Sequence, residues 1–154
     1  AVGFEELRTA EEVDRALEFM RRFRCDKLAD QSVFTMSSGE QMKIMITRAL
    51  LTQPELLILD EPSVFLDLPG REFLLSEIAE VARELPDLTI IFVTQRTEDI
   101  LPLFDRGMII KSGRVMCSGS RAEVLNDRNL CEAFGMPIRT VCNRSGRVWA
   151  VLDD

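Results

Sequence analysis

The sequence contains no histidine, and its four cysteines show no C-x-x-C spacing. Histidine and closely spaced cysteine pairs supply most protein ligands of zinc, so a zinc site is not expected. We interpret the thiols as reduced, structural side chains of a cytosolic protein; they are Cys25, Cys117, Cys131 and Cys142.

Long apolar runs are missing too. No window approaches the roughly 18 continuous apolar residues of a membrane-spanning helix. The N-terminal residues do not have the layout of a signal peptide. Any contact with a membrane is therefore expected to run through a partner protein.

Basic residues are the minority among the charged ones. Lysine and arginine number 19 against 26 aspartates and glutamates, which gives a net charge of −7. Broad, sequence-independent binding to nucleic acid needs a basic face that displaces counterions. A nucleic-acid partner is therefore not expected.

The 154 residues, 46% of them hydrophobic, suffice for one domain with a buried core. Apolar periodicity and the positions of proline and glycine predict an α/β chain. Helices are expected at 10–23, 37–52 and 69–85, with short ones at 98–103, 121–125 and 129–134. Strands are expected at 56–59 and 88–93, hairpins at 106–118 and 138–152, and a connector at 26–35. The first two strands are expected to be parallel, because a helix joins them.

The segment Met36–Gln41 (Met-Ser-Ser-Gly-Glu-Gln) places small residues directly before a helix. Free backbone N–H groups, two hydroxyls and the positive end of the helix dipole converge there, which is an arrangement that binds anions. Ser37 and Glu40 also have the spacing of a capping box. Taken alone, this segment could be an ordinary helix cap.

The segment Leu56–Pro62 (Leu-Leu-Ile-Leu-Asp-Glu-Pro) is an apolar run that ends in two acids. A buried parallel strand would deliver these carboxylates to the carboxyl edge of a sheet. Asp60 could hold Mg²⁺ through its water shell, and Glu61 could orient or deprotonate a water that attacks a phosphoryl group. Taken alone, the strand could simply end in solvated acids.

Together the two segments resemble the ATP-binding-cassette (ABC) ATPases. Met36–Gln41 is similar to their signature motif, usually Leu-Ser-Gly-Gly-Gln/Glu, and Leu56–Pro62 to their Walker B strand with its catalytic glutamate. The similarity continues in order along the chain through Leu66-Asp67 (D-loop), Val93–Gln95 (switch-histidine strand), Asp105–Gly119 (final hairpin) and Glu123–Leu125 (its helix). The resemblance implies a P-loop NTPase fold of the ABC type, with parallel core strands, part of a helical subdomain and C-terminal antiparallel hairpins.

The resemblance also implies roles for single residues. Nucleotide binding would fall to Ser37, Ser38, Gly39 and Glu40, the first three on the γ-phosphate of an ATP held by the opposite subunit. Asp60 would serve Mg²⁺, Glu61 and Gln95 would be catalytic, and Asp67 would communicate across the dimer.

Three departures from the family pattern stand out. Ser38 replaces the first signature glycine, and its Cβ limits the approach of a phosphate. Gln95 replaces the switch histidine; it cannot carry a proton, so slower hydrolysis is expected than for a Gln95→His variant. The phosphate loop G-x-x-x-x-G-K-S/T is absent.

The missing phosphate loop leads us to expect the C-terminal part of a nucleotide-binding domain, beginning inside its helical subdomain. We divide it into 1–52 (helical subdomain and signature helix), 53–104 (Walker B to switch loop) and 105–154 (C-terminal hairpins and helices). Because the strand of the phosphate loop normally lies beside Walker B, an exposed apolar sheet edge is expected unless another chain or segment covers it.

The expected function is that of an importer-type ABC transporter subunit that hydrolyses ATP with Mg²⁺. Its partners would be a second nucleotide-binding domain and a transmembrane permease, which would hold it on the cytoplasmic face of the cell membrane. The activity would belong to the intact protein, and the present chain alone would be inactive. Two alternatives stay open: a degenerate cassette that binds without hydrolysing, and the carboxyl lobe of a chromosome-maintenance (SMC-like) ATPase.

Overall fold

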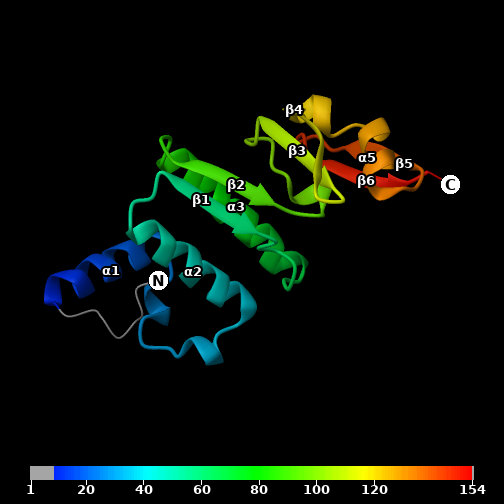
Figure 1. Ribbon diagram of the computed structural model, residues 1–154. Helices are drawn as coiled ribbons and strands as arrows, with labels where there is room; N and C mark the ends of the chain where they lie inside the picture. Colours follow the sequence, from blue (N-terminus) through cyan, green and yellow to red (C-terminus); the bar gives the residue numbers. More distant parts are fainter. Residues whose placement is uncertain (1–8, 154) are drawn as a thin grey trace. The chain divides into compact units, whose positions relative to one another are not determined.

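The computed structural model describes residues 9–153, which form two compact units that divide between Ile91 and Phe92. The first unit holds α1 (Ala10–Arg22), the 3-10 turns η2 (Asp26–Leu28) and η3 (Val33–Thr35), α2 (Ser38–Leu51), β1 (Leu56–Asp60), α3 (Leu68–Glu84) and most of β2 (Thr89–Val93) (Figure 1). The second holds η4 (Thr97–Asp99), β3 (Arg106–Lys111), β4 (Arg114–Ser120), α4 (Arg121–Val124), α5 (Asp127–Phe134), β5 (Ile138–Cys142) and β6 (Val148–Leu152). The predicted three-part division is finer than this one and stays a prediction; residues 1–8 of its first part lie outside the described residues.

The two leading helices begin where their capping residues predict. Thr9 caps α1, where its side chain accepts a hydrogen bond from the backbone N–H of Glu12, and the Glu12 carboxylate accepts from the backbone N–H of Thr9. Ser37 and Glu40 form the same reciprocal pair at α2. Gln53 follows α2 in a left-handed conformation (φ 49°) before Pro54, where the chain leaves the helix for β1.

Strands β1 and β2 form a two-stranded parallel sheet with α3 along one face (Figure 1). On the covered face Leu57 and Leu59 are each 7% exposed. On the opposite face Leu56, Ile58 and Ile91 are 47%, 57% and 45% exposed. The exposed apolar residues therefore form a face of the sheet, whereas the sequence predicts an exposed apolar edge.

The second unit contains both predicted hairpins. Strands β3 and β4 pair antiparallel, with an irregularity between Ile109 and Ile110. Strands β5 and β6 pair antiparallel from Ile138 opposite Leu152 to Cys142 opposite Val148. The predicted antiparallel character of the C-terminal part is thus confirmed.

Two local predictions need correction. The short helix expected at 98–103 is wrong, because only the single 3-10 turn Thr97–Asp99 forms. Pro102 explains the difference, since proline has no N–H and disfavours a helical conformation at the residue before it. The connector 26–35 contains the turns η2 and η3 instead of being wholly irregular. Among residues 9–153, no helix combines the length and the apolar character needed to cross a membrane.

Candidate functional site

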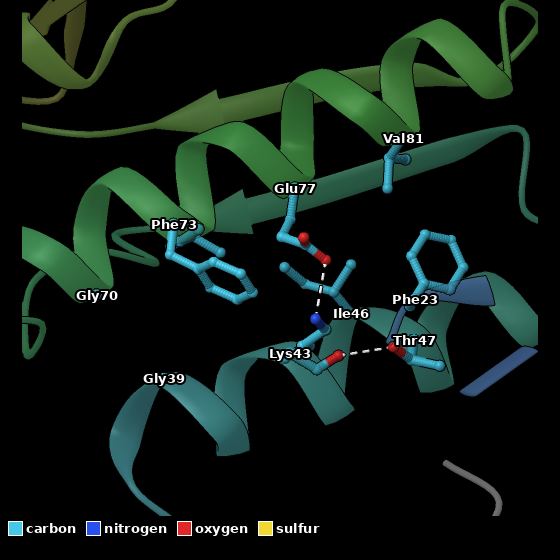
Figure 2. A pocket seen from close by; sticks show the side chains of 10 residues that line it. Phe23, Gly39, Lys43, Ile46, Thr47, Gly70, Phe73, Glu77 and Val81 are labelled. Carbon is cyan, nitrogen blue, oxygen red and sulfur yellow. Dashed lines mark hydrogen bonds and ion pairs between the residues drawn. The ribbon is translucent and has the colours of Figure 1, made fainter. Parts of the chain in front are cut away.

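Three chain segments lie toward one end of the first unit. The first turn of α2, the first turn of α3 and the carboxyl end of β1 all lie on the same side in Figure 2. Gly39 of α2 and Gly70 of α3 line one small cavity there. The segments that the sequence predicts to be functional, apart from the one that carries Gln95, therefore share one end of this unit.

The loop before α2 is held by its own capping pair. The backbone N–H and the hydroxyl of Ser37 each donate to a carboxylate oxygen of Glu40 at 2.8 Å, and the Glu40 N–H donates back to the Ser37 hydroxyl at 3.3 Å. The backbone bond from Ser37, followed by its hydroxyl, lowers the pKa of Glu40 below its usual value. A phosphate that reached this loop would compete with the Glu40 carboxylate for the Ser37 donors.

Ser38 and Gly39 form the first residues of α2, where backbone N–H groups have no partner within the helix. Ser38 is exposed and Gly39 is partly exposed. A Cβ added at Gly39 would meet no atom within 4 Å. Packing among the described residues therefore does not require glycine at this position. The close approach of an external group to the backbone would require it.

Strand β1 ends in the two predicted carboxylates. Asp60 is exposed and Glu61 is partly exposed. The Glu61 backbone takes the left-handed conformation (φ 47°), which is unfavourable for a residue other than glycine. Its carbonyl accepts from the Val64 N–H at 3.2 Å, so the chain turns sharply here. Such backbone strain is common at functional sites.

Asp67 is the N-cap of α3. Its side chain accepts from the backbone N–H of Gly70 at 2.9 Å. A Cβ at position 70 would lie 2.8 Å from the same carboxylate oxygen, so glycine there is required by the cap. Two residues before Asp67, Phe65 is 87% exposed.

An ion pair joins α2 to α3 beside the cavity. Lys43 Nζ lies 3.2 Å from a Glu77 carboxylate oxygen, with these side chains only 10% and 13% exposed (Figure 2). The same Nζ lies 4.6 Å from the centre of the Phe73 ring, which is within the range of a cation–π interaction. The cavity is about 20 Å³, room for about one water. This pair fixes the spacing of the two helices whose first turns carry Gly39 and Gly70.

Lys43, Phe73 and Glu77 were not predicted. Lys43 stands one helical turn after Gly39, but its partner is 34 positions away in the sequence, and no local pattern marks the two as a pair. Only the helical spacing of Lys43, Ile46 and Thr47, which places them on one face, hints that this lysine is enclosed.

Gln95 belongs to the second unit. It follows β2, its side chain is exposed, and the next residue, Arg96, donates its N–H to the Thr94 hydroxyl at 3.0 Å. The structure thus places Gln95 on an exposed turn between β2 and η4.

The chain is similar in sequence to a family model and to several known proteins. Residues 3–64 match the family model described as ABC transporter. The chain is 37% identical over 144 residues to the uncharacterized ABC transporter ATP-binding protein YlmA of Bacillus subtilis, covering 94% of this chain and 54% of that protein. It is 31% identical over 140 residues to the energy-coupling factor transporter ATP-binding protein EcfA2 of Clostridium perfringens, covering 91% and 48%. It is 36% identical over 112 residues to the molybdenum import ATP-binding protein ModC of Escherichia coli, covering 73% and 32%.

Solved structures agree in fold. One, described as an inward-facing metal-chelate type ABC transporter, matches with a TM-score of 0.83 at 18% identity and covers 99% of this chain and 62% of that one. Another, cbiO1 of Clostridium perfringens, part of the ABC transporter complex cbiONQ, matches with a TM-score of 0.67 at 27% identity and covers 83% and 51%.

The sequence and the fold are those of an ABC transporter ATP-binding protein. The chain spans about half the length of the first two relatives. The segments that carry the resemblance, Met36–Gln41 and Leu56–Pro62, lie within the matched residues 3–64.

Proposed function

We propose that the protein to which this chain belongs hydrolyses ATP at a dimer interface and drives transport by a separate membrane subunit. The carrying observation is that the α2 N-terminus, the acidic end of β1 and the α3 N-terminus lie on the same side of the first unit. Anion-binding amides and phosphoryl-transfer carboxylates are the two groups that such chemistry needs. The present chain alone would complete no site.

In this proposal the residues divide the work of phosphoryl transfer. Backbone N–H groups at Ser37, Ser38 and Gly39 hold the γ-phosphate of an ATP bound by the partner subunit. For this contact the Glu40 carboxylate must release the Ser37 donors that it now occupies.

On the chain's own nucleotide, Glu61 orients the attacking water and accepts its proton. The left-handed backbone at Glu61 supports this role, because backbone strain of this kind is common at functional sites. Gln95 would hydrogen-bond the γ-phosphate through its amide, without supplying charge. Asp67, as the cap of α3, would communicate between the two nucleotide sites of the dimer.

Mg²⁺ bound with nucleotide takes one or two carboxylates, and the other ligands are phosphate oxygens and water. Asp60 fits this demand, because it is a single exposed carboxylate at the end of β1. The ion would neutralise charge on the phosphates when bound.

The partners we propose are a second nucleotide-binding domain and a permease, which would hold the protein on the cytoplasmic face of the membrane. An importer is favoured because EcfA2, ModC and cbiO1 are named as parts of energy-coupling factor, molybdenum import and cbiONQ transporters. The chromosome-maintenance alternative gains no support from these relatives. The transported substrate would be chosen by other subunits.

The test is ATP turnover by the complete protein and its Glu61→Gln variant. We expect turnover to fall by at least about 100-fold while ATP binding persists, because the variant keeps the shape but loses the base. Glu55→Gln, an exposed acid just before β1, is the matched control and should keep full turnover. Equal turnover by Glu61→Gln and the unchanged protein would refute the role of Glu61.

The degenerate-cassette alternative has specific support in this chain. Ser38 and Gln95 depart from the family pattern, and Glu40 occupies the Ser37 donors. The same experiment separates the two proposals: a complete protein that binds ATP but shows no turnover, with or without Glu61→Gln, would be a binding module.

A further inference from the structure

The turn that follows Gln95 is bound by the C-terminal hairpin, β5 and β6 with their connecting residues (138–152). The backbone N–H of Ala150 on β6 donates to the Thr97 hydroxyl at 2.8 Å. Arg147 Nε, at the start of β6, donates to the backbone carbonyl of Glu98 at 2.7 Å. Both bonds are partly buried and join positions about 50 residues apart in the sequence.

The tip of the same hairpin reaches the next part of this segment. Gly146 has a left-handed backbone (φ 81°), and a Cβ there would lie 3.4 Å from Cγ of Pro102. Arg121 donates a side-chain N–H to the Gly146 carbonyl, which holds the tip. The segment from Thr97 to Pro102 is therefore bound at its start, at Glu98 and near its end.

Burial shows that this contact is tight. Thr97 is 5% exposed and Asp99 is fully buried, although both are polar. Gln95, two residues before Thr97, is exposed. A single residue, Arg96, separates the exposed glutamine from the bound turn, so little backbone freedom remains at Gln95.

We propose that the C-terminal hairpin is a positioning element for Gln95. Arg147 and Thr97 hold the backbone of the turn, and the turn in turn sets where the Gln95 amide points. This inference rests on the proposed function, in which Gln95 meets the γ-phosphate. Glutamine offers only a neutral, directional hydrogen bond, so its contribution depends on geometry more than a charged side chain's would.

The hairpin thereby acquires a role in turnover. Arg147 and Thr97 are positioning residues that touch neither nucleotide nor water in this account. Their effect should pass through Gln95 and should disappear when Gln95 is absent.

The experiment uses the complete protein with Arg147→Ala, and with Arg144→Ala as the charge-matched control on the same hairpin. Arg144 is exposed and makes no bond to the turn. We expect Arg147→Ala to lower kcat by about tenfold with KM for ATP within about twofold, because a small misplacement of a reacting group is costly. Arg144→Ala should leave both unchanged.

A second pair of variants guards against a folding defect. Thr97→Val removes the acceptor for the Ala150 N–H while keeping the side-chain shape, and Thr97→Ser keeps the acceptor. We expect Thr97→Val to lower kcat as Arg147→Ala does and Thr97→Ser to restore it. Hydrogen exchange of the peptide 94–99 should quicken in Arg147→Ala and Thr97→Val only.

A double-mutant cycle decides whether the effect passes through Gln95. In a Gln95→Ala background, Arg147→Ala should cause no further loss of kcat. Wild-type kcat and exchange in Arg147→Ala, or additive losses in the cycle, would overturn the inference. Failure of the proposed function is a separate outcome, since it appears as full turnover by Glu61→Gln or as no turnover by the unchanged protein. In either case the exchange measurement still reports on the turn.

Discussion

Gly39 is an unfavourable residue for the first turn of α2, because glycine in a helix is destabilising by roughly 0.5–1 kcal/mol relative to alanine. Its conformation does not need glycine, and a Cβ would meet no atom within 4 Å. Among the described residues, no contact explains why the less stabilising glycine is present here. An external phosphate that approaches the backbone would explain the residue.

Gly39→Ala therefore separates stability from function. We expect its free energy of unfolding in urea to rise by roughly 0.5 kcal/mol, while ATP turnover of the complete protein falls by about tenfold or more. Gly135→Ala is the control, because Gly135 has a left-handed backbone (φ 71°) and alanine should lower stability there. A Gly39→Ala protein with higher stability and full turnover would contradict a close phosphate approach.

Glu61 shows what the sequence could and could not predict at this scale. Its place after an apolar strand was evident, since Leu56–Leu59 leads directly into two acids. Its left-handed backbone was not, because glutamate rarely adopts that conformation and no neighbouring glycine or asparagine marks it. Strain of this kind is set by the surroundings of the turn.

Among the elements, α2 and α3 carry the two loops and are joined by Lys43 and Glu77. Removing one partner of a nearly buried pair leaves an uncompensated charge, whereas removing both does not. Lys43 and Glu77 form such a nearly buried ion pair, because they are 3.2 Å apart and both side chains have low exposure.

We expect Lys43→Met or Glu77→Gln alone to lower the free energy of unfolding by about 2–3 kcal/mol. The double variant should lose clearly less than the sum, by about 1 kcal/mol or more. Urea unfolding of the four proteins measures this coupling. Arg83→Met, on an exposed side chain of α3, is a control that should change stability little. Additive losses would show that the two side chains act independently.

Elements that are set by contacts between residues close in the sequence could be predicted, and elements that depend on distant residues could not. The starts of α1 and α2 were predictable, because each capping box lies within four residues. The helix expected at 98–103 does not form, since Pro102 disfavours a helical conformation at the residue before it and β6 binds Thr97 from about 50 residues away. Local patterns contain no information on such distant partners.

For the whole molecule, the uncovered face of the β1–β2 sheet is the main feature. Leu56, Ile58 and Ile91 are all exposed on strands whose sequence is apolar on both faces. Parallel strands of this composition normally have both faces covered. The present chain spans about half the length of its relatives, and we propose that another part of such a protein covers this face.

In the proposed dimer the two loops are shared between the subunits. If Ser37–Gly39 completes the partner's site and Glu61 serves the chain's own, each site draws one loop from each subunit. In a mixed dimer one subunit carries a defect in the Ser37–Gly39 loop and the other a defect at Glu61. Both defects then lie in the same site, and the other site is intact. If both loops served one subunit's site, every site in the mixture would carry one defect.

The measurement is ATP turnover after mixing two inactive variants of the complete protein, Ser37→Arg and Glu61→Gln, under conditions that exchange subunits. With random exchange half the dimers are mixed and each has one intact site, so we expect turnover to recover to about a quarter of the unchanged protein's value. The separate variants, treated in the same way, should stay inactive. A mixture as inactive as its components, with subunit exchange verified, would contradict the shared-site account.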